Sequence, residues 1–358
     1  MNMNSAYDFD FEIIAGTYEE FLIGYLCSIK ENSVKQSFAS HDHTSSIRTV
    51  AYSDQYLASG SADDRIIIYD LTTRKECNML VHHSGTITCL QFTNEGRHLI
   101  SGSSDGLLVI TRVGNWQVEK IWDKAHKGLG IFDVAIHPSG KLALTLGADT
   151  TLRTWNLVKG RQAYAINLNS KSKDAKSLEK IVWDPDGIYF ILYGGKYTEI
   201  WNIEDGGIFK FVKHDEKVTS CIWLNNDKIL VGHENGQITV VTLEDCSKFS
   251  KIAHSSRVKS LAKYKDWIVS ISSNGQFKIW SETLSELLME NTGCRPTCLC
   301  VVPTLKVKKE EITLEEEKEE EIIPNNVKPR VIITEDSDEV ESEEEKQTQK
   351  RPKKKRKN

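Results

Sequence analysis

The sequence has few of the features that mark membrane, secreted or metal-binding proteins. No apolar run approaches the ~20 residues that a membrane-spanning helix needs. The acidic start, MNMNSAYDFDFE, lacks the basic and apolar segments of a signal peptide. The eight cysteines include no C-x-x-C pair, which leaves Cys298-x-Cys300 without the second pair that a metal clip would need. We therefore expect reduced thiols in the nucleus or cytosol, with no metal and no cofactor.

What the sequence does contain is a repeat. Between residues 125 and 156, three short runs alternate apolar and polar residues, IFDVAI, LALTLG and TLRTWN, with turn residues between them. This pattern predicts three antiparallel strands. Asp149 lies six residues before Trp155, and the same spacing separates Asp63 from Tyr69 and Asn274 from Trp280.

The repeat continues over most of the chain. The equivalent turn position falls at Glu19, Asp63, Asp105, Asp149, Gly195, Asn235 and Asn274. The steps between them are 44, 42, 44, 46, 40 and 39 residues, close to the period of about 40–45 residues of a four-stranded propeller blade.

The two ends of the repeat region complement each other. The first unit has only three predicted strands between residues 11 and 38, and RPTCLCVVP at residues 295–303 reads like the first strand of the other units. A strand from the C-terminal end that joins the N-terminal blade would close the ring and leave few free edges. We therefore expect an all-β, seven-bladed β-propeller over residues 1–303.

From Phe11 to Pro303 these units resemble the repeats of WD-repeat proteins. In that family a His before the first strand, a Ser or Thr on the second, an Asp in the turn and a Trp on the third form a hydrogen-bonded set. The set maps fully onto His126, Thr145, Asp149 and Trp155. Two units keep part of it, namely His41 or His43 with Ser59, Asp63 and Tyr69, and His254 with Ser270, Asn274 and Trp280.

The other units depart from that set, with Thr111 and Val241 in place of Trp and Gly195 in place of Asp. We expect apolar packing to hold those blades. Asp, His and Ser also make up hydrolase triads, but here they recur at blade period and end on Trp, as a structural network would. The P-loop, HExxH and G-x-G-x-x-G patterns are absent. The sequence therefore predicts a protein that is not an enzyme.

After Pro303 the composition changes to blocks of charge. Residues 310–321 hold eight Glu, residues 335–345 hold eight acidic residues and residues 350–357 hold seven basic ones. Such blocks bury little apolar surface, so we expect residues 304–358 to be a mostly disordered tail. The basic end fits a nuclear targeting signal for an import receptor or a patch that neutralises phosphates, with a merely solubilising tail as the alternative. Its residues are Lys350, Arg351, Lys353, Lys354, Lys355, Arg356 and Lys357.

One connection, NLNSKSKDAKSLEK at residues 167–180, is longer than its counterparts. It leads into a first strand, so we expect it on the same face as His126 and the Asp149 turn. We interpret the loop as a contact for a partner protein or ribosomal RNA, with an ordinary solvated loop as the alternative. The residues that would carry this contact are Lys171, Lys173, Lys176 and Lys180.

The order of the units narrows the resemblance. The stretches IIAGTYEEFLIGY, LASGSADDRIIIYDL and GLGIFDVAIHPSGKLALTLGADTTLRTWNL look like those of the p21-activated protein kinase-interacting proteins and their fungal counterpart, which is required for large ribosomal subunit assembly. The resemblance implies a nucleolar assembly factor that binds proteins or rRNA of pre-large-subunit particles. It also implies a second role, binding and restraining the regulatory segment of a p21-activated kinase.

A chromatin or ubiquitin-ligase adaptor is a third alternative, for which the sequence shows no recognisable reader pocket. We expect a monomer in the nucleus and nucleolus that does not contact membranes.

Overall fold

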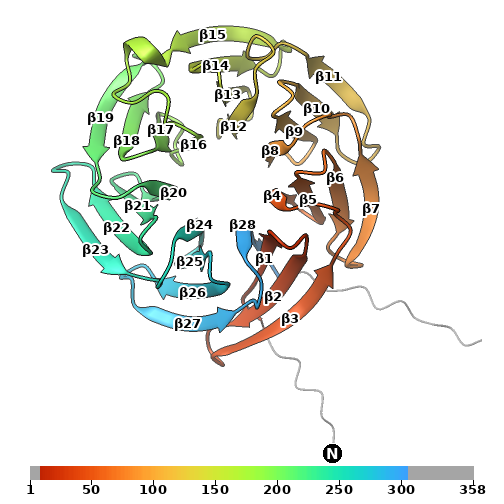
Figure 1. Ribbon diagram of the computed structural model, residues 1–358, viewed down its shortest axis with the longest axis vertical. Coiled ribbons are helices and arrows are strands. Elements are labelled where there is room, and N and C mark those ends of the chain that lie inside the picture. The colour runs from red at the N-terminus through yellow and green to blue at the C-terminus, as the bar shows by residue number, and fades with distance from the viewer. Residues whose placement is uncertain (1–8, 305–358) are drawn as a thin grey trace, which may run out of the picture. The chain divides into compact units, whose positions relative to one another are not determined.

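The computed structural model describes residues 9–304, which form 28 strands in seven four-stranded antiparallel sheets (Figure 1). Each sheet is one blade of a ring, and the blades are numbered here in chain order. The all-β, seven-bladed propeller predicted from the repeat is confirmed. Within the described residues no helix is long and apolar enough to span a membrane. The predicted charged tail and its basic end lie outside these residues, so the boundary placed at residue 303 stays a prediction.

The first three blades cover the chain up to Trp122. The first blade contains β1 (Phe11–Thr17), β2 (Leu22–Ser28), β3 (Ser33–Ser40) and the C-terminal β28 (Pro296–Pro303). The second contains β4 (Ile47–Ser53), β5 (Tyr56–Ser61), β6 (Ile66–Asp70) and β7 (Lys75–Leu80). The third contains β8 (Ile87–Phe92), β9 (His98–Ser103), β10 (Leu108–Arg112) and β11 (Val118–Trp122).

The remaining four blades continue the ring. The fourth contains β12 (Ile131–Ile136), β13 (Leu142–Gly147), β14 (Thr151–Asn156) and β15 (Arg161–Asn167), and the 3-10 turn η1 (Leu168–Ser170) follows it. The fifth contains β16 (Lys180–Trp183), β17 (Tyr189–Gly194), β18 (Tyr197–Asn202) and β19 (Gly207–Lys213). The sixth contains β20 (Val218–Asn225), β21 (Lys228–His233), β22 (Gln237–Thr242) and β23 (Lys248–Ile252). The seventh contains β24 (Val258–Tyr264), β25 (Trp267–Ser272), β26 (Gln276–Ser281) and β27 (Glu286–Asn291).

The ring closes as the sequence predicts. β28 pairs antiparallel with β1, from Phe11 opposite Pro303 to Gly16 opposite Cys298 (Figure 1). The first blade is therefore built from both ends of the propeller, and each blade contributes its innermost strand to the wall of the channel. Each sheet ends in an innermost strand and an outermost strand, so one edge of every blade faces the channel and the other faces the rim of the ring.

Adjacent blades pack closely through apolar side chains on their inner strands. All seven residues of β1 are buried, whereas the outermost strand β3 is only partly covered. A Cβ atom added at Gly60 would lie 2.5 Å from Ile87 Cγ2 of the next blade, and one at Gly16 would lie 2.5 Å from Ile47 Cγ2. These glycines let neighbouring blades approach, so larger residues there would push the blades apart.

The innermost strands share an irregularity near their start. In six of the seven, the pairing register shifts by one residue, which is the mark of a β-bulge. A bulge redirects the extra side chain, here toward the mouth of the central channel. The bulge residues are Arg48, Thr88, Phe132, Thr219, Lys259 and Thr297.

Candidate functional site

The fourth blade brings its four expected residues together in one buried chain of hydrogen bonds. His126 Nδ1 donates to Asp149 Oδ1 at 2.8 Å, and its Nε2 lies 2.7 Å from Thr145 Oγ1. The Trp155 indole donates to the same Thr145 oxygen at 2.8 Å. Burial lowers the pKa of His126, which favours the neutral imidazole that this pattern requires. The set joins the strands of the blade. The Thr145 hydroxyl is already bonded to His126 and Trp155.

The second blade uses a similar arrangement with one difference from the family pattern, at Tyr69. His43, not His41, lies 2.7 Å from Ser59 Oγ and 3.0 Å from Asp63 Oδ2, whereas His41 lies beside Glu20. The Tyr69 hydroxyl donates to Asp42 at 3.1 Å. Tyr69 therefore anchors the segment before β4. A Trp at this position would instead donate to the Ser on the second strand, Ser59.

The seventh blade departs from the sequence prediction at the turn. His254 Nε2 lies 2.7 Å from Ser270 Oγ, to which the Trp280 indole donates at 2.8 Å. Asn274, however, donates to Ser255 at 3.1 Å, and His254 Nδ1 instead faces Gln276 Oε1 at 3.3 Å. Gln276 lies two residues beyond the expected position, and its longer side chain reaches the ring.

The third blade shows that the expectation of apolar packing alone is incomplete. His83 lies 2.8 Å from Ser101 Oγ and 3.2 Å from Asp105 Oδ2, although no Trp completes the set. The buried Thr111 Oγ1 at the Trp position has no hydrogen-bond partner among residues 9–304. In the sixth blade, His233 still contacts Thr239 at 3.0 Å. Polar contacts therefore persist in blades that depart from the family pattern.

A nucleophile-elbow spacing, G-x-S-x-G, occurs once, at residues 102–106. A true elbow places its Ser between a strand and a helix. Ser104 lies in the turn between the antiparallel strands β9 and β10, so the match has the wrong context. In the part of the chain that the structure describes, no three His, Cys, Asp or Glu residues gather as a metal site would require.

The fifth blade contains a buried carboxylate that sequence reasoning missed. Glu199 on β18 is fully buried and accepts the Trp201 indole N–H on Oε2 at 3.1 Å. Its other oxygen, Oε1, accepts the Ser172 hydroxyl at 2.7 Å and the Lys173 backbone N–H at 3.0 Å. Glu199 thus takes the place of the missing turn Asp and ties the long loop to the blade. The signal for it was a Glu beside Ile and Trp in the strand-like run YTEIWN.

The long loop bridges the fourth and fifth blades. It begins beside the Asp149 turn, where Leu168 N–H donates to Thr150 O at 3.0 Å and Asn169 donates to Thr150 Oγ1 at 2.6 Å. Leu168, Ala175 and Leu178 are buried in the core between these blades. The loop is therefore packed onto the ring along its length.

The four lysines of the loop have different environments. Lys171, Lys173 and Lys176 are exposed; Lys171 Nζ donates to Gly206 O at 2.7 Å, and Lys173 lies over the Phe211 ring at 5.1 Å. Lys180 is separate, because it belongs to β16 and pairs with Asp133 at 3.2 Å in the channel wall. Only the first three can form the predicted outward contact.

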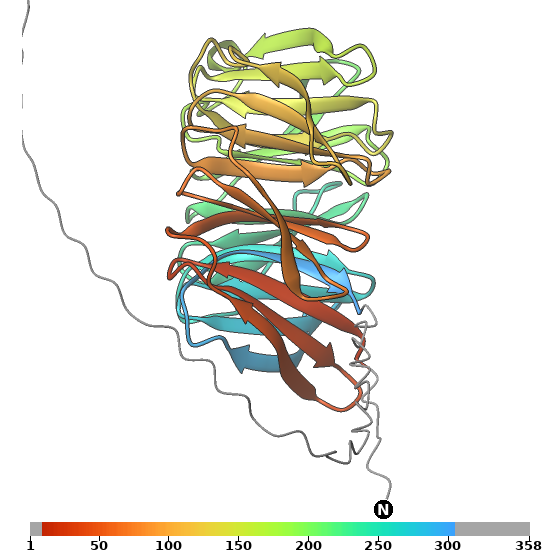
Figure 2. The same ribbon diagram turned by 90° about the vertical axis from the view of Figure 1, so that its right-hand side faces the viewer.

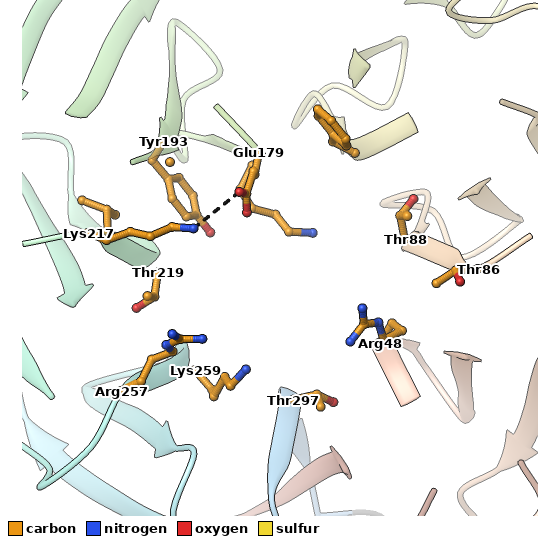
Figure 3. Close-up of a pocket in the computed structure, with 14 residues that line it drawn as sticks. Arg48, Thr86, Thr88, Glu179, Tyr193, Lys217, Thr219, Arg257, Lys259 and Thr297 are labelled. Carbon is orange, nitrogen blue, oxygen red and sulfur yellow. Dashed lines mark ion pairs between the residues drawn. The ribbon is translucent and has the colours of Figure 1, made fainter. Parts of the chain in front are cut away.

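The bulge residues line a cavity of about 470 Å³ at the channel mouth (Figure 3). Three hydroxyls there are used within the ring, since Thr88 donates to Ile131 O at 2.7 Å, Thr219 to Gly232 O at 3.0 Å and Thr297 to Gly16 O at 3.0 Å. The charged lining is mostly basic, and Glu179 is its one acidic residue among residues 9–304. The basic lining residues are Arg48, Lys180, Lys217, Arg257 and Lys259. The sequence had shown no such pocket, because its residues come from all seven blades.

Comparisons with known proteins agree with this architecture. The family described as "WD domain, G-beta repeat" matches residues 32–70, 74–110 and 118–156. The p21-activated protein kinase-interacting protein 1-like of Danio rerio is 34% identical over 304 residues, which cover 81% of this chain and 80% of the relative.

Human and fungal proteins extend the comparison. The human p21-activated protein kinase-interacting protein 1 is 33% identical, over 81% of this chain and 76% of its own length. Protein MAK11 of Saccharomyces cerevisiae is 27% identical, over 81% and 82%. The propeller and these relatives together show that the chain belongs to the WD-repeat family of p21-activated protein kinase-interacting proteins.

Proposed function

We propose that this protein is a non-enzymatic scaffold for assembly of the large ribosomal subunit, acting in the nucleus and nucleolus. In this proposal the ring is a rigid platform, and the loop over residues 168–179 contacts proteins or rRNA of the pre-ribosomal particle. The sequence resemblance to a fungal protein required for large-subunit assembly supports it, as does the basic stretch at residues 350–357, which would serve nuclear import.

The observation that carries the proposal is the anchoring of the loop. Glu199 and three buried apolar residues hold the loop in one conformation while Lys171, Lys173 and Lys176 remain exposed. A preordered loop loses less conformational entropy on binding than a mobile one. Its positive charge suits an acidic surface such as RNA phosphate, with a salt-dependent affinity.

The test is sedimentation of the tagged full chain from nuclear extract on sucrose gradients at low and raised salt. We expect co-migration with large pre-ribosomal particles and partial release by salt. The triple variant K171Q/K173Q/K176Q should move toward light fractions. The matched variant K141Q/K159Q/K228Q, which removes three exposed lysines elsewhere on the ring, should not. Wild-type protein found only in light fractions would contradict the proposal.

A kinase-regulating role is the second candidate, because several relatives carry kinase-binding names. They include the human protein above and "Shk1 kinase-binding protein 15" of Schizosaccharomyces pombe, which is 27% identical to this chain. This role predicts direct binding of the purified full chain to the regulatory segment of a p21-activated kinase. Binding there, together with absence from particles, would rank this role first.

A further inference from the structure

The channel mouth carries basic charge that the ring does not neutralise. Three of its five basic residues have acidic neighbours, because Lys180 pairs with Asp133, Lys217 with Glu179 and Arg257 with Glu234. Arg295, outside the mouth, pairs with Glu19. Arg48 and Lys259 have no acidic partner among the described residues. Each is a bulge residue, so the backbone itself aims it into the channel.

The two unpaired cations lie close to further positive charge. Figure 3 shows Arg48 and Lys259 on either side of Thr297, with their charged ends toward the open channel. Burial, followed by the nearby Arg257, Arg48 and Arg295, lowers the pKa of Lys259. Like charges held together in a partly desolvated site repel one another, and an anion relieves that repulsion.

The shape of the site favours a short extended segment. A second cavity of about 350 Å³ shares Arg257, Lys259 and Thr297 with the mouth and continues outward to Tyr18 and Arg295. Together they form a groove across the junction of β24 and β28. Cavities of this size, within the usual range of about 300–1,000 Å³, hold small ligands or a few residues of a peptide.

The aromatic residues argue for a peptide over RNA. Single-stranded nucleic acids are held largely by bases stacked on open aromatic faces. Tyr193 is buried, and the guanidinium of Arg295 covers the Tyr18 ring at 4.3 Å from its centre. Among the described aromatics of the mouth and groove, Phe132 and the other face of the half-exposed Tyr18 ring remain for stacking, whereas cations line the whole path.

We propose that the mouth and this groove bind an acidic peptide segment of a partner protein, with Arg48 and Lys259 pairing with its carboxylates. Extended peptides place alternate side chains on one side, about 6.6 Å apart, so every second residue of an acidic run can face the groove. The inference does not depend on a role in ribosome assembly, because it concerns ligand chemistry and not the particle that supplies the ligand.

The test is fluorescence anisotropy of a labelled decapeptide of alternating Glu and Asp with the purified full chain. We expect saturable binding that weakens with salt, and at least about a tenfold loss of affinity in R48Q/K259Q. The charge-preserving R48K/K259R should bind within about threefold of wild type. K141Q/K228Q, which removes two exposed lysines at turns between first and second strands, is the matched control and should bind like wild type. Thermal unfolding of each variant checks that the ring is intact.

Three outcomes would overturn the proposal. The first is absence of binding by wild type, or equal binding by R48Q/K259Q. The second is tighter binding of an RNA decamer than of the peptide with the same dependence on Arg48 and Lys259, which would assign the site to nucleic acid. The third is peptide binding only after the acidic residues of 335–345 are changed to amides, which would assign the groove to the chain's own acidic segment. Loss of particle association in gradients with peptide binding intact would instead refute only the assembly role.

Discussion

The fourth and fifth blades hold a buried Trp in two different ways. In the fourth, Trp155 donates to the Thr145 hydroxyl, which a neutral His126 links to Asp149. In the fifth, Trp201 donates directly to the carboxylate of Glu199. The hydrogen bonds of the fourth blade stay within its own sheet and the turn before it. In the fifth blade, Glu199 also accepts two hydrogen bonds from the loop that precedes that blade.

The buried hydrogen-bond site of the fifth blade therefore also determines the conformation of an exposed loop. A buried carboxylate needs several donors, and the fifth blade finds two of them in Ser172 and Lys173. Satisfying Glu199 therefore orders the same loop that presents the exposed lysines. The fourth blade has no such link between its Trp and an outward-facing loop of comparable length.

The largest expected effect is that of Glu199→Ala. It would leave the Trp201 indole, the Ser172 hydroxyl and the Lys173 amide without their acceptor, and we expect the free energy of unfolding to fall by about 3 kcal/mol or more. Glu199→Gln, which keeps one carbonyl acceptor, should lose less. Urea unfolding measures both variants, and a loss below about 1 kcal/mol for Glu199→Ala would contradict this account of the fifth blade.

Asp149→Ala should have a smaller effect, about 2 kcal/mol. Although burial opposes ionisation, hydrogen bonds from Thr151 and His126 lower the pKa of Asp149. The alanine variant removes that acceptor but leaves Trp155 bonded to Thr145. The same urea experiment compares it with Glu199→Ala, and a reversed order would show that the complete family network is the more important one.

The pH dependence of stability tests the buried histidines that bond a Ser or Thr of their blade, such as His254 in the seventh blade. Burial lowers the pKa of His254 to about 4, from 6.5 in an exposed chain. Below pH 6.5 the unfolded chain takes up a proton that the folded chain refuses, so stability is lost as pH falls from about 6.5 to about 4. The slope is about 1.4 kcal/mol per pH unit for such a residue. His254→Gln should flatten the measured slope, and an unchanged slope would show that His254 does not remain neutral.

The smallest effect is expected at Asn274, where the seventh blade departs from the family pattern. Because His254 Nδ1 faces Gln276, Asn274→Ala should cost less than about 0.5 kcal/mol. Gln276→Ala should cost more, since it removes the acceptor beside a buried imidazole. Thermal unfolding compares the two variants. Equal losses would contradict this account, and a larger loss for Asn274→Ala would favour the position expected from the sequence.

The sequence predicted the repeated blades better than the contacts that differ from one blade to another. Blade period and the strand-like stretch RPTCLCVVP were sufficient for seven blades and for closure by β28, because both follow from local alternation. Glu199 was missed because its two partners in the loop lie 26 and 27 residues away in sequence, and no local pattern shows that they meet. Gln276 was missed because its contact with His254 depends on the shape of the turn between β25 and β26. The channel mouth is a tertiary feature, since a bulge that turns Arg48 or Lys259 inward leaves no mark on apolar periodicity.

Amide hydrogen exchange over residues 172–177 tests most directly whether the fifth-blade carboxylate orders the lysine loop (Figure 2 shows the ring edge-on). In the wild-type chain the Lys173 amide donates to buried Glu199, so this segment should be protected. Glu199→Ala should raise its exchange rate at least about tenfold, while Asp149→Ala should leave it unchanged. Fast exchange in wild type, or equal rates in wild type and Glu199→Ala, would contradict the claim that Glu199 ties the blade to the loop.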